Sequence, residues 1–577
     1  MNKGVLWSGK NFITPQAASV IDSSALTPVT LGGANNLAIL GNMIGLIPSG
    51  AITCVSDPSL AQSLLNPLSD DAIQGVKLAF APSPGANGAA QIFLIPVNAA
   101  TQASVTIGSV LTFLSFMFGI PANQIKLKVE TGTLIGKKIT VSFQGNTETF
   151  DNLAKSSFSV QYIGAGSACA MTILPTLAGH SLATICAGAT ADNLSLDMTS
   201  FTTIQALCDA ISSAGPYTVT VLAQQANTDL SMNLDAVITQ DIKTAPYTAA
   251  SNMQACLDGI NGKSNYITVS SVVDAGAAPA NVDWTFLTGA VNGTTTTTDW
   301  QNALNLLKTV QMDIIVPLSS DPAIHSMVDA HCVYMSGFSG KSERRSFVGG
   351  VLQSYVGEVA RAAAIAALVT AASNLNSDRT VHCGLGSVTI DQNGNSTLYP
   401  GYQTACMYAG IAAGNSPVFP LTNKFLNCSA LEVDLRPDEI DTLLDAGIAP
   451  PIPDTVNGGY IVSRQLTTWN QSDDLYRIEY SVGRGADYIA AQVRARHKTL
   501  VGQPGLLGQG TTIVNLTNAV LQAALTDGYI TSFDPKQTTL RVVGTVWYVD
   551  YSAVPVLPIN FVFSTYHLLP TNFTIGL

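Results

Sequence analysis

Charged side chains are scarce in this chain: they make up 11% of its 577 residues, against about 25% in ordinary soluble proteins. A compact monomer of this mass would expose about 19,000 Å² of surface. Such a low charge content indicates that partners cover much of that surface. The net charge of −12 also argues against nucleic acid as a partner, because phosphates would be repelled.

Long hydrophobic runs are missing as well. The most apolar run, residues 359–372, is rich in alanine and interrupted by Arg361, and no segment approaches the roughly 20 apolar residues that span a bilayer. The chain begins with Met1 and Lys3 and no apolar stretch follows, so a signal peptide is not expected. These absences predict a protein that is assembled in a cytosol and does not insert directly into a membrane.

The nine cysteines form no CxxC pair and lie in apolar surroundings. We expect most of them to be buried small side chains. An odd number of cysteines fits free thiols in a reducing compartment. An intersubunit disulfide, formed after release from the cell, stays open as an alternative.

Catalytic motifs are absent too. No GxSxG elbow occurs, and the six histidines are dispersed. The tripeptide GKS at 340–342 imitates the end of a phosphate loop, but Met335 occupies the position of the required glycine. His325, Asp329 and His331 do not have the spacing of a zinc motif, so we interpret them as polar residues on a helix face. We expect no enzymatic activity, no cofactor and no metal.

Two clusters of basic residues stand out against this background: Lys341, Arg344 and Arg345, and then Arg494, Arg496 and Lys498. We interpret the first cluster as a solvated face of the protein. For the second cluster, a solvated face and a binding surface both stay open.

Changes in sequence pattern divide the chain into five parts. Residues 1–30 lack a helical period and indicate an arm, whereas residues 31–120 and 246–458 alternate strands with helices, as in α/β layers. Residues 121–245 carry short alternating runs and one helix at about 201–211 with Ile204, Leu207 and Ile211 facing inward, which predicts a β-rich insertion domain. Residues 459–577 form a C-terminal domain that ends in a strand arm. The expected fold class is a mixed α/β multidomain protein.

The C-terminal domain is expected to contain two helices and several strands. Residues 460–469 alternate apolar and polar side chains, which is typical of a half-buried strand. A helix at about 487–500 buries Ile489 and Val493 and turns a cationic face outward, and a second follows at 512–527. Two long strands are expected at 541–554 and 557–568, the latter ending almost at the terminus.

This order of elements resembles the C-terminal domain of the contractile tail sheath proteins of myovirus-like bacteriophages. The core of such sheaths has a TGG.DG loop before a helix and a buried strand. Here the similar segments are LTGAVNG at 287–293, TDW at 298–300 and DIIVP at 313–317. Ala290 and Asn292 depart from the loop pattern.

Three further segments resemble the same family. They are the first sheath strand, LAILG at 37–41, the helix that follows LYPGY at 398–402, and the segment PLTNK at 420–424. Together the similar segments cover about the first 110 residues and everything after about residue 250. Their shared order makes the resemblance specific.

The resemblance implies a structural subunit that forms stacked hexameric rings around a tail tube and contracts to drive the tube through the host envelope. Its partners would be copies of itself, the tail tube protein, and the baseplate and tail terminator proteins. The protein would belong to the virion and be assembled in the host cytoplasm. The insertion would lie on the outside of the sleeve.

The resemblance also implies roles for particular residues. A strand at each end of the chain would pair with neighbouring subunits, which singles out Ala18, Ser19, Val20 and Ile21 near the start and Ile559, Phe561, Val562 and Phe563 near the end. The helix that carries Arg494, Arg496 and Lys498 would face the tube.

Two alternatives remain at this stage. A tailocin or a type VI-like secretion device would use a sheath of the same fold. An extracellular surface-layer or adhesin protein would share the low charge content and the composition rich in threonine, asparagine and glycine.

Overall fold

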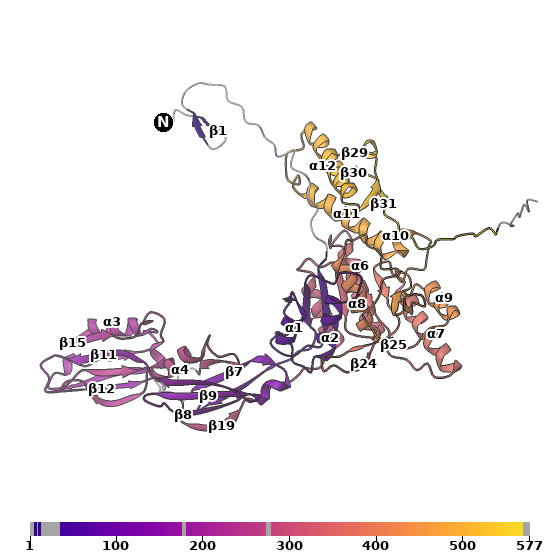
Figure 1. The fold of residues 1–577 in the computed structure, drawn as a ribbon. Helices are drawn as coiled ribbons and strands as arrows, with labels where there is room; N and C mark the ends of the chain where they lie inside the picture. The colour runs from indigo at the N-terminus through magenta and orange to yellow at the C-terminus, as the bar shows by residue number, and fades with distance from the viewer. Residues whose placement is uncertain (1–4, 8–9, 13–34, 176–179, 273–277, 569–577) are drawn as a thin grey trace, which may run out of the picture.

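The computed structural model describes residues 5–7, 10–12, 35–175, 180–272 and 278–568. Figure 1 shows a central α/β part, a pair of β-rich lobes that extend from one side of it, and a C-terminal lobe on the other side. The chain exposes 28106 Å², far more than the roughly 19,000 Å² of a compact chain of this mass. The elongated lobes contribute to this excess.

The central part is built on a six-stranded sheet with the order β22-β21-β20-β3-β5-β4. All neighbouring strands run parallel except β4, which is antiparallel to β5. All five residues of β3 are buried, as expected for a parallel sheet covered on both faces. The strands are β3 Leu37–Gly41, β4 Thr53–Val55, β5 Ile92–Pro96, β20 Ile314–Pro317, β21 Arg345–Val348 and β22 Thr380–His382.

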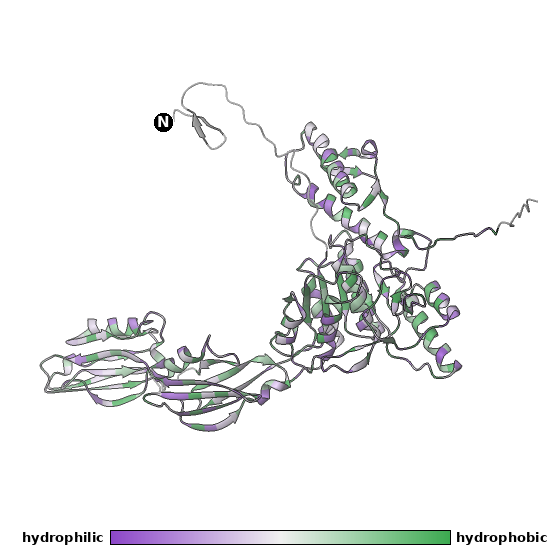
Figure 2. Cartoon of the chain, viewed as in Figure 1, coloured by the Kyte–Doolittle hydropathy of each residue, from purple (hydrophilic) through white to green (hydrophobic). Residues whose placement is uncertain are grey.

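Helices cover both faces of this sheet. Alternate residues of β3 pack into two different clusters: Leu37 and Ile39 meet α2 and α8, whereas Ala38 and Leu40 meet α5 and α6. Residues 401–413 of α8 are all buried, and Figure 2 shows the apolar residues of the central part gathered in this region. The helices are α1 Pro58–Leu64, α2 Asp70–Phe80, α5 Thr297–Leu307, α6 Pro322–Ser336 and α8 Gly401–Gly414.

Local sequence explains where these helices begin. Thr296 caps α5 by accepting a hydrogen bond from the amide of Asp299, and the Asp299 carboxylate accepts one from the amide of Thr296. This reciprocal arrangement satisfies two amides that the helix leaves without a partner. The helix and strand expected after the loop at 287–293 are therefore present, as α5 and β20.

A smaller group of elements lies beside the sheet. Helix α7 contains the apolar run at 359–372. Contrary to the expectation from the sequence, it is long and apolar enough to cross a membrane by length and composition, and it is the one such helix among the described residues. It packs Ile365 and Leu368 against α9 and its surroundings, and its Arg361 pairs with Glu439 at 2.7 Å. The elements are α7 Glu358–Leu375, α9 Pro437–Asp445, β23 Ser387–Ile390, β24 Ser396–Tyr399, β25 Ala430–Leu431, β26 Pro451–Pro453 and β27 Tyr460–Val462.

The lobe next to the central part, which we call the proximal lobe, contains two small sheets with the orders β18-β7-β6 and β10-β9-β8-β19. Helix α4 packs on them through Met253, Cys256 and Ile260. The elements are β6 Gln102–Ile107, β7 Leu111–Phe118, the 3-10 helix η2 Ile120–Gln124, β8 Lys126–Thr131, β9 Lys137–Phe143, β10 Asn146–Leu153, α4 Asn252–Ile260, β18 Ile267–Ser271 and β19 Val282–Phe286.

The outer, distal lobe has two sheets of its own, with the orders β15-β11-β17 and β14-β13-β12-β16. Helix α3 buries Ile204, Leu207 and Ile211, the three residues that the sequence predicted to face inward. The elements are β11 Ser156–Tyr162, β12 Ala168–Leu174, β13 Ser181–Ala187, the 3-10 helix η3 Thr190–Asp192, β14 Ser195–Asp197, α3 Ile204–Ala214, β15 Tyr217–Val221, the 3-10 helix η4 Ser231–Asn233, β16 Val237–Asp241 and β17 Tyr247–Ala250.

The two lobes together extend beyond the insertion expected at 121–245. Strand β7, which precedes residue 121, pairs with β18, which follows residue 245. These pairings close the proximal lobe from both ends of the inserted chain. A change in sequence pattern marks where alternating runs begin, but it does not show which distant strand a given strand will pair with.

The C-terminal lobe has two helices and short strands. They are α10 Leu475–Ile478, α11 Tyr480–Lys498, α12 Leu507–Thr526, β28 Ile530–Ser532, the 3-10 helix η5 Pro535–Gln537, β29 Thr539–Val543, β30 Val546–Asp550 and β31 Val554–Pro555. Ile489 and Val493 of α11 pack with Val520, Leu521 and Ala524 of α12, which confirms the expected buried side of the first of these helices.

The structure corrects the strands expected after this helix pair. The expected strand at 541–554 is a hairpin of β29 and β30, because Gly544 makes a turn with a φ of 60°. The expected strand at 557–568 is not paired with any other described segment, and these residues form a largely exposed tail. An extended segment becomes a strand only when another backbone pairs with it.

The close packing of α8 on α2 generates a prediction. A Cβ added at Gly410 would lie 2.7 Å from the Cα of Ala79, so Gly410→Ala should destabilise the protein by about 1–3 kcal/mol. In α12, Gly508 has nothing within 4 Å of an added Cβ. The matched variant Gly508→Ala should therefore be neutral or stabilising by up to about 1 kcal/mol. Urea unfolding followed by circular dichroism compares the two; equal shifts would contradict the close packing.

Candidate functional site

Helix α11 connects the central part to the C-terminal lobe. Its first residues are buried in the central part, where Tyr480 joins the same apolar cluster as Phe347 of β21. Its later residues Ile489 and Val493 belong to the core of the C-terminal lobe. The sequence predicted the start of this helix at Asp487 and missed its first two turns, because Gly483 and Gly485 weaken the helical signal.

A buried ion cluster fixes this helix to the sheet. The Asp487 carboxylate contacts the Arg345 guanidinium at 2.8 Å and the Arg379 guanidinium at 2.6 Å. The hydroxyl of Tyr476 donates to the same carboxylate at 3.1 Å. Arg345 and Arg379 are 2% and 11% exposed. Since two guanidinium groups share one carboxylate at low exposure, each charge depends on the others for compensation.

A third buried guanidinium, that of Arg344, lies next to this cluster. Arg344 donates to the carbonyl of Val310 at 2.6 Å and lies 2.8 Å from Nε2 of His331. Burial, together with the Arg344 charge, lowers the pKa of His331 to about 3. The interpretation of Lys341, Arg344 and Arg345 as a solvated face is therefore wrong for both arginines. Their partners lie in other elements of the fold, so local sequence pattern did not reveal them.

The residues considered as metal ligands each have other partners. His325 lies 2.8 Å from the carbonyl of Ser319, and Asp329 accepts a hydrogen bond from Thr380 at 2.6 Å. His331 contacts Arg344. Within the described ranges, no group of three or more His, Cys, Asp or Glu side chains is placed to hold a metal ion.

The predicted basic face on α11 is less uniform than the sequence suggested. Arg494 pairs with Glu343 at 2.5 Å and is 38% exposed. Arg496 is half-buried and already engaged in an interaction, whereas Lys498 is exposed. Of Arg494, Arg496 and Lys498, Lys498 is therefore the most accessible to a binding partner.

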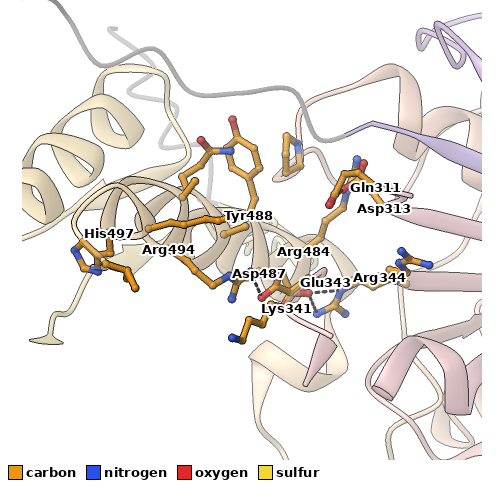
Figure 3. Close-up of a pocket in the computed structure, with 17 residues that line it drawn as sticks. Gln311, Asp313, Lys341, Glu343, Arg344, Arg484, Asp487, Tyr488, Arg494 and His497 are labelled. Carbon is orange, nitrogen blue, oxygen red and sulfur yellow. Dashed lines mark hydrogen bonds and ion pairs between the residues drawn. The ribbon is translucent and has the colours of Figure 1, made fainter. Parts of the chain in front are cut away.

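A cavity of about 800 Å³ lies between this part of α11 and the central part. Figure 3 shows Asp487, Arg484 and Arg494 reaching it from α11, and Glu343 and Asp313 from the opposite side. Arg484 also donates to the side chain of Asn35 at 2.8 Å. Burial raises the pKa of Asp313. The walls of the cavity carry both signs of charge, and much of that charge is already paired within the chain.

The tail after β31 is the most exposed apolar segment of the C-terminal lobe. Its apolar side chains include Ile559, Phe561, Val562 and Phe563, which are 83%, 67%, 81% and 93% exposed. Figure 1 shows the tail running away from the molecule as an extended chain. Asn560 tethers it by donating to Glu479 at 2.9 Å, and Arg464 lies 5.7 Å from the ring of Phe561.

The hairpin of β29 and β30 offers an edge for pairing. Among the described residues it is a two-stranded sheet, so each strand has one partner. Val542, Val543, Val546 and Tyr548 on it are between 43% and 52% exposed. At the other end of the chain, β1 Val5–Trp7 and β2 Lys10–Phe12 pair as a hairpin. Ala18, Ser19, Val20 and Ile21 lie outside the described residues.

These features describe a structural protein with an exposed apolar tail and, among the described residues, sheet edges that are left open. No protein-family model matches the chain. It is 30% identical to the tail sheath protein of Bacillus phage SP01 over 98% of this chain and 97% of that protein. It is also 24% identical to a putative tail sheath protein of Enterococcus phage phiEF24C over 96% of both chains.

Solved structures agree on the fold. A sheath tail protein from Desulfitobacterium hafniense matches with a TM-score of 0.56 and 14% identity, covering 94% of this chain and 97% of that one. One from Listeria innocua matches with a TM-score of 0.54 and 15% identity, covering 92% and 94%. The chain belongs to the contractile phage tail sheath proteins. It is thus a structural, non-enzymatic component of a virion.

The ion cluster around Asp487 generates a prediction. Asp487→Asn removes the charge that compensates Arg345 and Arg379, so it should lower the free energy of unfolding by about 3–5 kcal/mol. Asp473 is exposed, and Asp473→Asn, which makes the same chemical change, should stay within about 0.5 kcal/mol. Chemical denaturation of both variants measures the difference. Similar stabilities would show that the cluster contributes little.

Proposed function

We propose that six copies of this chain form a ring, that the rings stack helically around a tail tube, and that contraction of the stack drives the tube through the host envelope. The observations that carry this proposal are the exposed C-terminal tail and, elsewhere on the same lobe, a hairpin with open edges among the described residues. Unpaired backbone groups on extended apolar segments recruit strands from other chains.

Strand addition would connect the subunits. The tail of one copy, with Ile559, Phe561, Val562 and Phe563, would pair with the hairpin of β29 and β30 in another copy. The N-terminal segment, including Ala18, Ser19, Val20 and Ile21, would add a further strand from a third. Because donor and acceptor are different surfaces, such contacts propagate head to tail and build a helical assembly.

The structure of α11 supports a contraction by whole subunits. One end of this helix is buried in the central part and the other forms the core of the C-terminal lobe. The ion cluster at Asp487 holds the helix to β21. A helix fixed at both ends transmits rotation without bending, so the subunit would turn as a rigid body. The movement would then be taken up by the arms between subunits.

The exposed area supports extensive contact with neighbours. The chain exposes 28106 Å² and has few charges to solvate it. The lobes that extend from the central part would lie on the outside of the sleeve, and the C-terminal lobe near the tube. The baseplate and tail terminator proteins would contact the two ends of the stack, and α11 would present Arg494, Arg496 and Lys498 to the tube.

The tail generates a prediction about assembly. Proline has no backbone N–H, so Phe561→Pro with Val562→Pro removes two successive donors, one of which must face any partner strand. The tail makes few contacts with the other described residues, so the circular dichroism spectrum should not change. Sleeve formation, seen by electron microscopy, should be lost.

The matched control for the tail is Phe561→Ala with Val562→Ala, which removes the same side chains and keeps both donors. It should assemble more weakly than the native chain but still form sleeves. Sleeves of normal length in the proline variant would contradict strand addition by the tail. Loss of the native circular dichroism spectrum in the proline variant would show that the tail contributes to the fold, contrary to this prediction.

The tube contact generates a further prediction. Lys498→Glu should weaken attachment of the extended sheath to an acidic tube while leaving sleeve formation intact. One exposed charge pair contributes only about 0.2–1 kcal/mol, but every subunit repeats the change. Lys536 is exposed on η5 of the same lobe, and Lys536→Glu has the same effect on net charge. Co-sedimentation with assembled tubes at low and high salt compares the two; equal binding would show that Lys498 is merely solvated.

A further inference from the structure

The distal lobe places two cysteines opposite each other on neighbouring strands. In the antiparallel pair of β12 and β13, Cys169 is the direct partner of Cys186. Each side chain is 1% exposed and belongs to the apolar cluster of the lobe. Both thiols are free. The two side chains therefore lie on the same inner face of one sheet.

The backbone hydrogen bonds show what kind of pair this is. The carbonyl of Cys169 accepts from the amide of Ile242 at 3.0 Å, on the side of β16. The amide of Cys186 donates to the side chain of Asn193 at 2.7 Å, away from β12. Both backbones thus direct their hydrogen bonds away from each other, which makes Cys169 and Cys186 a non-hydrogen-bonded pair.

This type of pair has the spacing that a disulfide needs. Cα atoms in non-hydrogen-bonded antiparallel pairs lie about 4.5 Å apart, and disulfides span Cα separations of about 4.4–6.8 Å. The sulfur atoms also share a neighbour, because the Tyr217 hydroxyl lies 3.4 Å from Sγ of Cys186 and 3.9 Å from Sγ of Cys169. The sheet can accept a bond between them without a change in strand register.

We propose that Cys169 and Cys186 form a disulfide within one subunit when the protein meets a low-molecular-weight disulfide such as oxidised glutathione. The first protein thiolate attacks the small disulfide and releases one small thiol. The second protein thiolate then attacks the mixed disulfide and releases the other. Two protein thiols are oxidised and lose their protons, and one small disulfide is reduced to two thiols.

The surroundings of the pair determine when the reaction takes place. Burial raises the pKa of the Cys169 thiol to about 12, and the thiolate is the reactive form. Exchange therefore needs a local opening of the lobe and is slow in the native protein. This timing rests on the assignment of the protein to a phage tail. The thiols would stay reduced in the host cytosol and be oxidised after release into an oxidising medium.

The bond would strengthen the outermost part of the subunit. It joins adjacent strands of one sheet and restricts the unfolded states of the lobe. The sheet has the order β14-β13-β12-β16, so β12 and β13 are its two inner strands. The bond would therefore reinforce the sheet at its centre. The oxidised lobe should resist proteolysis better than the reduced one.

Cleavage before aspartate residues provides a direct test. It releases the peptide 151–191, which contains Cys169 and Cys186 and no other cysteine, and the peptide 197–208, which contains Cys208. The full chain is incubated with oxidised glutathione, either without urea or at a urea concentration below the unfolding transition of the protein. It is then alkylated and cleaved, and the peptide masses are measured by mass spectrometry. The peptide 151–191 should lose two hydrogens and take up no alkyl group, and it should do so faster in urea.

Controls make the outcome decisive. Cys208, which is buried in the same lobe on α3, should still be alkylated once. In Cys186→Ser, the peptide 151–191 should keep one alkylatable thiol. Two alkyl groups on this peptide after refolding with oxidised and reduced glutathione would overturn the proposal. So would a stable glutathione adduct on either cysteine, or a bond from either cysteine to any other.

Discussion

The carboxylate of Asp487, shared by the guanidinium groups of Arg345 and Arg379, is the interaction on which the arrangement of this subunit depends. It holds α11 against the edge of the central sheet at a point where all three charges are nearly excluded from water. Removing the Asp487 carboxylate would leave two buried guanidinium groups without this compensating charge. Because α11 continues into the core of the C-terminal lobe, the cluster orients that whole lobe relative to the sheet.

This constraint is suited to a sheath subunit. A sleeve that contracts needs subunits that keep their shape and connections that survive a change of position. Here the rigid element is inside the subunit, and the extended tail with its exposed apolar side chains is outside it. The low charge of the chain fits the same picture, because surface that neighbours cover needs little solvation.

Some parts of the fold could be predicted from local pattern. The buried strand at 314–317 was expected from the resemblance to the sheath core. The buried side of α11 at Ile489 and Val493 and the inward residues of α3 follow from hydrophobic periodicity. Other parts depended on distant residues. Arg344 and Arg345 look like surface cations in the sequence but are buried against His331 and Asp487, and the glycines at 483 and 485 concealed two turns of helix.

The sequence alone determined the family, the mixed α/β character and the lack of a catalytic motif, since these depend on residue order and composition. Tertiary structure decided which charges are buried and which strands pair, because both depend on segments that lie far apart in the chain. It extended the expected insertion beyond residues 121–245 through the pairing of β7 with β18. It also left residues 557–568 without a paired strand among the described residues, because an extended segment becomes a strand only when a second backbone pairs with it.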